Sequence, residues 1–446
     1  QALEKNTTAS NNTAVGLNSL FKNTTGDLNV AVGREAMSAN TTGSENTGVG
    51  RNSLGANTTG ATNVAVGALA LDANTTGSSN TAVGQAALTG NTTANNNTAV
   101  GQGVLAANTT GTGNSGLGAD SLNDCTTGDY NVALGYQSLA VNTTADNNTG
   151  LGAYTLYDNT TASNNTAVGF SALANNTTGS ENVAIGVNAL LTNTTAAENT
   201  AIGVNAMYAN TTGGDNVAIG HNTLDANTTG ADNTAVGKAA LSANTTGHSN
   251  TAIGKSSLVS NSTGLRNTAL GFNSSGGVTT GDDNIMIGYL SGNHVVGSTT
   301  GNNNTFIGSQ SRVSSAATSN ANVLGYNVSG AAGYTTLGIS GDDIRAAHGN
   351  VTWATVSDER YKKDITDATT GLSFINALQP RTWNYKTLGE LPETFNAYEE
   401  GSTEVFKNTQ TNHGFIAQEV KTAIDADSGL KDGFRLWDER DDGAQE

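Results

Sequence analysis

Ser357 is followed closely in the sequence by two lysines, Lys362 and Lys363. A serine hydroxyl becomes a nucleophile when a neighbouring base accepts its proton, and a neutral lysine amine can be that base if burial lowers its pKa. The same segment also fits a helix start, in which Ser357 is the cap and Asp358 and Glu359 lie in the first turn. The spacing alone favours the helix cap, and the two roles are compatible.

The other side chains that could take part in catalysis or metal binding are dispersed along the sequence. No His-x-His or Glu-x-x-His pair occurs, so we expect no metal site, and nothing in the sequence indicates a cofactor. Carboxylates such as Asp27, Glu45 and Asp232 are expected to face outward, and no opposed pair of the kind a glycosidase needs stands out. A glycan-degrading enzyme is therefore a less favoured alternative. The histidines are His221, His248, His294, His348 and His413.

The composition is that of a repeat protein. Among 446 residues there are 56 Gly and only 2 Pro, with 13% charged and 5% aromatic residues. So few aromatic residues cannot build an ordinary large core, and a chain of this kind folds as a repeat if it folds at all. The formal net charge of −18 argues against binding to nucleic acid or to anionic membranes. No apolar run of about 18 residues is present, so we expect no membrane insertion.

A period of 17 residues runs without a slip from Asn6 to the copy that starts at Asn261, which makes sixteen copies. Counting from the first Asn of each copy, position seven is always Asn, position eleven is always Gly, and position ten is always Val, Ile or Leu. The single cysteine, Cys125, replaces the Asn of position one and is interpreted as a tolerated substitution. The expected structural ladder includes Asn12, Asn29 and Asn46 at position seven, and Gly16, Gly33 and Gly50 at position eleven.

Each copy predicts one coil of a parallel β-solenoid or β-roll. Asn-Val-Ala-Val-Gly reads as a short strand ended by a Gly turn, with the branched residue of position ten pointing inward. Coils stacked at about 4.8 Å let identical residues pack and let Asn amides bond along the axis. Since one Leu and one Val per coil make a thin core, we expect three chains to share it as a homotrimer.

The repeats over residues 6–271 resemble the head repeats of trimeric bacterial adhesins, which contain similar Asn-x-Ala-Ile-Gly units in a left-handed parallel β-roll. Two other interpretations of the Thr and Asn residues are disfavoured. An ice-binding face needs Thr-x-Thr, whereas Thr-Thr points to opposite sides of a strand. The many Asn-x-Thr glycosylation triplets are better explained by the structural ladder. Residues 1–271 thus form the predicted shaft.

Residues 272–346 contain further copies of the repeat at irregular spacing, around Ile285, Phe306 and Val323. We interpret this region as a thicker shaft or neck and as a candidate receptor-contact region. Residues 347–446 differ in composition and contain all three Trp and both Pro. They predict a small α+β domain with a helix over 371–378, a strand over 381–386, and a strand leading into a helix over 413–424.

The C-terminal domain carries a second resemblance. Ser357-Asp-Glu-Arg-Tyr-Lys-Lys-Asp-Ile365, Gly371-Leu372, Leu378-x-Pro380, Trp383-x-Tyr385 and Gly414-Phe-Ile-Ala-Gln-Glu-Val420 follow one another in the order typical of the peptidase S74 family. That family is the intramolecular chaperone at the end of phage tail fibres, tailspikes and endosialidases. The resemblance implies that the domain helps three chains fold and then cuts itself off.

The family pairing implies the roles of individual residues. The bond to be cut would be Val356–Ser357, with Ser357 as the nucleophile and Lys362 as its base, and Lys363 as the second choice. Members of the family usually continue into a long C-terminal helix. Here this assembly element is either absent or lies beyond Glu446, and any attachment module or secretion signal would precede Gln1.

The favoured hypothesis is a trimeric tail fibre of a virion. Its partners would be a host cell-surface glycan or protein receptor and the virion tail proteins upstream. A trimeric bacterial surface adhesin or extracellular filament is the alternative, and a glycan-degrading tailspike is a weaker one. No turnover enzyme is expected, only a single self-cleavage.

Overall fold

The computed structural model describes residues 1–293, 300–313, 315–349, 354–355, 372–393, 398–407 and 409–426. Two compact units make up the chain, Gln1–Val356 and Ser357–Glu446. The residues of the predicted cleavage site, Val356, Ser357, Lys362 and Lys363, lie outside the described residues.

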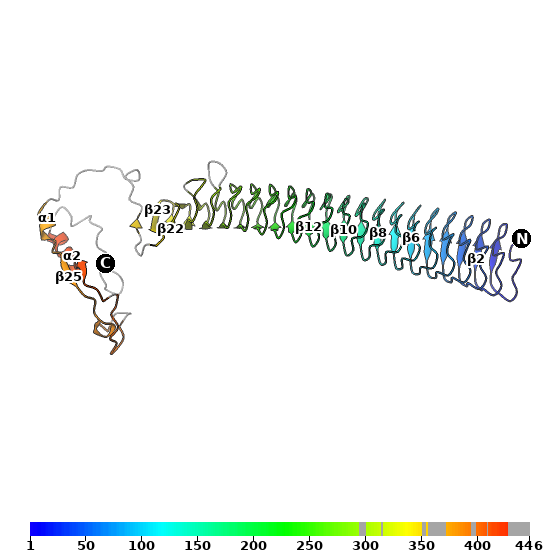
Figure 1. Cartoon of the computed structure of the whole chain (residues 1–446), viewed down its shortest axis with the longest axis horizontal. Helices are drawn as coiled ribbons and strands as arrows, with labels where there is room; N and C mark the ends of the chain where they lie inside the picture. The colour runs from blue at the N-terminus through cyan, green and yellow to red at the C-terminus, as the bar shows by residue number, and fades with distance from the viewer. Residues whose placement is uncertain are drawn as a thin grey trace. The chain divides into compact units, whose positions relative to one another are not determined.

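The first unit is a parallel β-solenoid of about nineteen coils, as the repeat predicts (Figure 1). Each regular coil contributes one three-residue strand, and each strand pairs in parallel with the strand 17 residues later, for example Ala14 with Ala31. The strands are β1 Thr13–Val15, β2 Val30–Val32, β3 Thr47–Val49, β4 Val64–Val66, β5 Thr81–Val83, β6 Thr98–Val100, β7 Ser115–Leu117, β8 Val132–Leu134, β9 Thr149–Leu151, β10 Thr166–Val168, β11 Val183–Ile185, β12 Thr200–Ile202, β13 Val217–Ile219, β14 Thr234–Val236, β15 Thr251–Ile253, β16 Thr268–Leu270, β17 Ile285–Ile287 and β18 Thr305–Ile307.

The core of each coil is a small set of residues that recur at the same positions. In the second coil these are Asn23, Asn29, Ala31, Ala36 and Met37, all fully buried. They occupy positions one, seven, nine, fourteen and fifteen of the repeat. Because each residue lies on its counterpart in the next coil, the stack buries a continuous column that no single coil could bury alone.

The prediction that position ten points inward is wrong. Position nine, always Ala or Gly in the regular coils, is the buried residue of each of their strands from the second coil onward, and position ten lies on the outer side, where Leu134 is 44% exposed. The reason is space: a Cβ added at Gly48 would lie 3.1 Å from Cγ of Met37 and 3.1 Å from Oγ of Ser53. Only a small residue fits opposite the side chains of positions fourteen and fifteen, so the alternation of the strand turns position ten outward.

Glycine at position eleven meets two demands at once. Gly16, Gly33 and Gly50 have φ of 127°, 140° and 137°, in the region that side chains disfavour. An added Cβ at Gly16 would also lie 2.5 Å from the carbonyl oxygen of Gly33 in the next coil. The invariance of this glycine in the repeat therefore follows from both its backbone conformation and the close approach of neighbouring coils.

The stack ends in strands of other lengths, the last of which pair antiparallel. Strand β20 Asn322–Tyr326 pairs with β18 and with β22 Tyr334–Ile339, and β22 turns back into the antiparallel β23 Asp342–Ala347, which pairs with β24 Ala354–Thr355. A short side pair joins β19 Arg312–Val313 to β21 Ser329–Gly330. The copy around Val323 is offset by one residue from the prediction, because Thr305 pairs with Asn322. Position seven of that coil is therefore Ala321.

The second unit is α+β in its described part, with the elements close to those the sequence predicts. Helix α1 is Leu372–Ala377 and helix α2 is Ala417–Ala426. Strands β25 Arg381–Trp383 and β26 Asn412–Gly414 pair antiparallel. A short 3₁₀ turn, η2, covers Leu388–Glu390.

Candidate functional site

The Asn residues of position seven form a ladder of side-chain and backbone bonds along the stack. The backbone N–H of Asn29 donates to Oδ1 of Asn12 at 2.8 Å, and that of Asn46 donates to Oδ1 of Asn29 at 3.0 Å. The same pattern recurs further along, where Nδ2 of Asn250 donates to the carbonyl oxygen of Gly264 at 2.8 Å. Asn29 thus links three neighbouring coils, through its backbone N–H to the coil before it and through its side chain to the coil after it.

A second ladder, formed by Asn at position one, was not singled out in the sequence. Nδ2 of Asn40 donates to Oδ1 of Asn23 at 2.8 Å and to the carbonyl oxygen of Gly43 at 2.9 Å. The same Gly43 carbonyl also accepts from Nδ2 of Asn29, at 2.9 Å. The two ladders therefore meet at one backbone oxygen in this coil, and the same holds at Gly60 and Gly77. Both sets of amides are buried from the second coil onward, so the Asn-x-Thr glycosylation triplets that the position-one Asn residues head are used by the fold.

Cys125 interrupts the position-one ladder. Its Sγ lies 3.6 Å from the carbonyl oxygen of Gly128 and 4.0 Å from Nδ2 of Asn142, which are weak contacts. Burial raises the pKa of the Cys125 thiol to about 11. A buried thiol of this kind is an inert structural residue and not a nucleophile.

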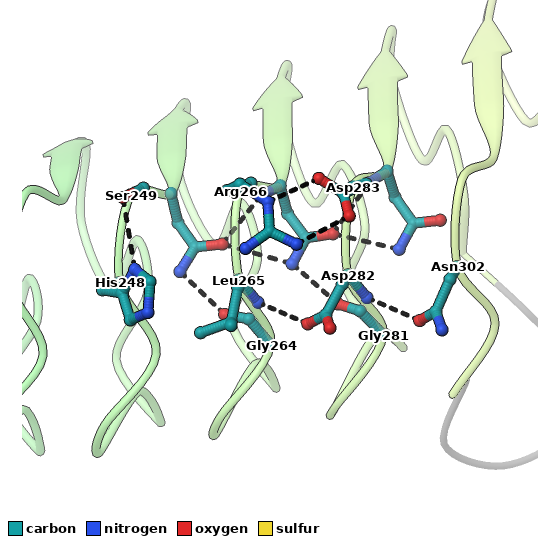
Figure 2. Close-up of polar contacts among 12 residues, drawn as sticks. His248, Ser249, Gly264, Leu265, Arg266, Gly281, Asp282, Asp283 and Asn302 are labelled. Atoms are coloured by element: carbon teal, nitrogen blue, oxygen red, sulfur yellow. Dashed lines mark hydrogen bonds and ion pairs between the residues drawn. The ribbon is translucent and has the colours of Figure 1, made fainter.

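The outer edge before strand β17 holds a group of polar contacts at positions five and six (Figure 2). Nε and Nη2 of Arg266 donate to the two carboxylate oxygens of Asp283, at 2.7 and 2.8 Å. The Arg266 guanidinium lowers the pKa of the Asp283 carboxyl. Oδ1 of Asp282 accepts from the backbone N–H of Leu265 at 2.8 Å. Both partners of the ion pair are exposed, so it orders this edge without adding much stability.

Four carboxylates stand in one row at position six of consecutive coils, in Glu181, Glu198, Asp215 and Asp232. The neighbouring charges of Asp215 and Glu181 raise the pKa of the Glu198 carboxyl. These carboxylates were not recognised as a row in the sequence, although their spacing of 17 residues places them at the same position of consecutive coils. Since they line one edge and do not face each other across a gap, they lack the opposed arrangement of a glycosidase.

Ala354 and Thr355, which precede Val356 of the predicted cleavage bond, are described. Thr355, next to Val356, pairs with Ile344 in the sheet of the first unit. The division between the two compact units falls between Val356 and Ser357. The predicted bond therefore lies one residue beyond a paired strand and at the boundary of the two units.

Two of the motif blocks of the C-terminal unit contact each other. Arg381 makes a two-pronged ion pair with Glu419, at 2.9 Å from Nε to Oε2 and 2.7 Å from Nη2 to Oε1, which lowers the pKa of the Glu419 carboxyl. A Cβ added at Gly414 would lie 2.9 Å from Cη2 of Trp383, so the Trp383 ring requires glycine on the neighbouring strand. The sequence motifs are thus contacts between β25, β26 and α2.

Within the residues that the structure describes, no three or more His, Cys, Asp or Glu side chains are gathered as a metal ion would require. Among the same residues, no helix combines the length and the apolar character needed to cross a membrane.

Comparison with known proteins gives one match. No curated protein and no solved structure matches the chain. Residues 357–429 match the model of the peptidase S74 family, described as the chaperone of endosialidase. The match begins at Ser357, where the second compact unit also begins. A β-solenoid of 17-residue coils followed by a peptidase S74 segment fits a tail fibre with a C-terminal chaperone domain.

Proposed function

We propose that this chain is the shaft of a homotrimeric phage tail fibre that attaches a virion to its host. A further part of the proposal is that its C-terminal domain assists trimer folding and then cleaves itself at Val356–Ser357. The coincidence at Ser357 of the family match and the unit boundary carries the proposal. A chaperone that is removed after folding has to be a separate compact unit, because its loss must leave the fibre intact.

The surface of the solenoid supports the trimer. From Val15 to Tyr326, every exposed large apolar side chain except Tyr208 lies at position six, eight, ten or twelve, by repeat or strand register. These positions form the outer face of the strands and its two borders. Elsewhere the surface is polar: position three, for example, is an exposed Thr in every regular coil. One apolar face running the length of a rod indicates contact with like chains.

The proposed cleavage is a single acyl transfer. Lys362, as a neutral amine, takes the proton of the Ser357 hydroxyl, and Oγ attacks the carbonyl carbon of Val356. The peptide C–N bond breaks, and the amine of Ser357 takes up the proton from Lys362. The acyl group of Val356 is then held as an ester on Oγ of Ser357. Water then hydrolyses the ester, so that Val356 ends in a carboxylate. After cleavage, the pairing of β24 with β23 would keep the new end of the fibre in its sheet.

The test compares the intact mass of the full-length product with that of Ser357→Ala and Lys362→Met. Wild type should yield fragments 1–356 and 357–446, and both variants should stay whole. Ser402→Ala and Lys363→Met are the matched controls and should be cleaved. If wild type stays whole, the domain is a retained assembly element. If Lys363→Met alone blocks cleavage, Lys363 is the base.

Host attachment needs its own measurement. The proposed receptor is a host-surface glycan or protein, contacted by residues 272–346, and tail proteins would hold the upstream end. Labelled fibre should co-sediment with susceptible bacterial cells. Periodate treatment of the cells should abolish binding to a glycan receptor, and protease treatment should abolish binding to a protein receptor. Absence of binding to any cells of a broad panel would contradict attachment.

A further inference from the structure

Two rows of side chains border the outer strand face along the whole stack. The leading row is position six, just before the buried Asn, and the trailing row is position twelve, just after the invariant Gly. In the fourteenth coil these are Asp232 and Lys238, and both are exposed. Their sequence separation of six residues spans about 20 Å of extended chain. Among the described residues, no ion pair joins the two rows.

The two rows differ in charge. The leading row carries carboxylates in the third, eleventh, twelfth, thirteenth and fourteenth coils, and the trailing row of the regular coils has none. Most of the cations of the regular coils lie instead in the trailing row, although the chain is strongly acidic overall. These trailing cations are Arg34, Arg51, Lys238 and Lys255.

The rows also match coil by coil. Glu45 shares its coil with Arg51, Asp232 shares its coil with Lys238, and Asp27, one residue before the leading row, shares its coil with Arg34. The match extends to size: Tyr130 shares its coil with Tyr136, at 63% and 46% exposure, and Gly113 shares its coil with Ala119. In no coil do both positions carry the same sign of charge. Because no ion pair joins the two rows within the described part of one chain, contact with a second chain is what explains the match.

We propose that the leading row of one chain packs against the trailing row of its neighbour in a parallel trimer whose chains are aligned coil for coil. The occupant of each border is thus a second copy of this chain. Three identical chains with their strand faces toward a common axis bring these two borders together at each of three seams. Attraction between unlike charges along a seam then fixes the alignment, which the Val, Ile or Leu that recurs at position ten of every regular coil cannot do.

The sequence of charges penalises slipped alignments. Moving one chain by one coil in one direction sets Lys255 against Arg266, and larger slips remove the match of Tyr130 with Tyr136. Slipping by one coil in the other direction keeps Lys238 near a carboxylate, that of Asp215. Lys238 therefore has an acidic neighbour in both favourable arrangements, which makes it the informative residue to change. The inference rests on the proposed trimer.

The first test is a charge reversal in the full-length chain. Lys238→Glu sets a new carboxylate against Asp232 and Asp215 at all three seams. It should weaken trimer association about tenfold or more, and the loss should shrink as salt rises to about 1 M. Lys22→Glu makes the same change of net charge at position seventeen, away from the strand face, and should leave association unchanged. Equal effects of the two substitutions would overturn the inference.

The second test is chemical crosslinking, in a Cys125→Asn background that removes the native thiol. Asp232→Cys with Lys238→Cys should give a covalent trimer on denaturing gels when treated with a short bismaleimide. Glu45→Cys with Lys238→Cys, eleven coils apart, should give none. Crosslinking of the distant pair alone would overturn the alignment. If sedimentation shows wild type to be a monomer, the proposed trimer fails as well. If it shows a trimer that neither pair crosslinks, only the present inference fails.

Discussion

Asn108 ends a run of stacked amides because its neighbour in the next coil, Cys125, has no amide to donate. Nδ2 of Asn108 donates to Oδ1 of Asn91 at 2.9 Å, as in the other coils. Its own Oδ1 is buried and has no hydrogen-bond partner. The same orphaned oxygen recurs at Asn261, where Val278 occupies the next place in the column. The position-one ladder thus runs in two segments, and each ends in an unpaired acceptor.

Restoring the amide should stabilise the shaft. Cys125→Asn gives Asn108 Oδ1 a donor and gives Asn142 a proper acceptor, so we expect a gain of about 1–2 kcal/mol in the free energy of unfolding. Urea unfolding followed by circular dichroism measures it. Cys125→Ala removes the thiol without adding a donor and should bring no gain. A Cys125→Asn variant less stable than Cys125→Ala would show that the column cannot accept the larger side chain here.

The thiol itself should be unreactive while the chain is folded. Burial raises the pKa of Cys125 to about 11, so the thiolate, which is the reactive form, is a minor species at neutral pH. Iodoacetamide should label the native protein very slowly at pH 7 and faster as the pH rises toward 11, provided the fold persists. Labelling in urea, where the thiol returns to its ordinary pKa, is the control. Equal rates in native and unfolded protein would contradict the buried placement.

Substitution of the buried Asn at position seven should destabilise the protein more than substitution of an exposed Asn. Nδ2 of Asn63 donates to the carbonyl oxygen of Gly77 at 2.8 Å, and its Oδ1 accepts from the backbone N–H of Asn80 at 2.9 Å. Asn63→Ala removes both bonds and leaves the buried backbone N–H of Asn80 unpaired, whereas the Gly77 oxygen still accepts from Asn74. We therefore expect a loss of about 2–4 kcal/mol in the free energy of unfolding.

The control for this prediction is Asn175→Ala, at an exposed position seventeen. It should change the free energy of unfolding by less than about 0.5 kcal/mol. Similar losses in the two variants would mean that the Asn ladder does not hold the coils together.

Much of the solenoid follows from the sequence because a period of 17 leaves few alternatives. Invariant Gly and Asn placed the turns and one ladder, and the strand register followed from the period. Which side of the strand faces the core was not predicted correctly. Val, Ile or Leu at position ten is the residue a core would ordinarily take, yet Ala at position nine is buried instead. The triplet alone fits either alternation, and the choice depends on the space left by positions fourteen and fifteen.

Backbone conformation explains the rest of what the sequence did not predict. Leu54 at position fifteen has a φ of 51°, and Glu45 at position six has one of 60°. Left-handed conformations are uncommon for residues other than Gly. A Leu or a Glu in the sequence therefore does not predict the sharp bends that these residues make here. The cleavage residues followed only from a family resemblance, because a Ser and a Lys five residues apart also fit a helix cap.

The strongest test of the coil geometry is at position eleven. Gly50 has a φ of 137°, and a Cβ there would lie 2.4 Å from the carbonyl oxygen of Gly67, which is backbone and cannot move aside. Gly50→Ala should therefore cost about 3 kcal/mol or more in the free energy of unfolding, measured in urea.

Gly214→Ala is the matched control. A Cβ at Gly214 finds its nearest neighbour at 3.2 Å, and other coils carry Ala at this position, as in Ala197. This control should lie within about 0.5 kcal/mol of wild type. A Gly50→Ala variant as stable as the control would mean that neighbouring coils do not approach each other at position eleven as closely as the stack requires.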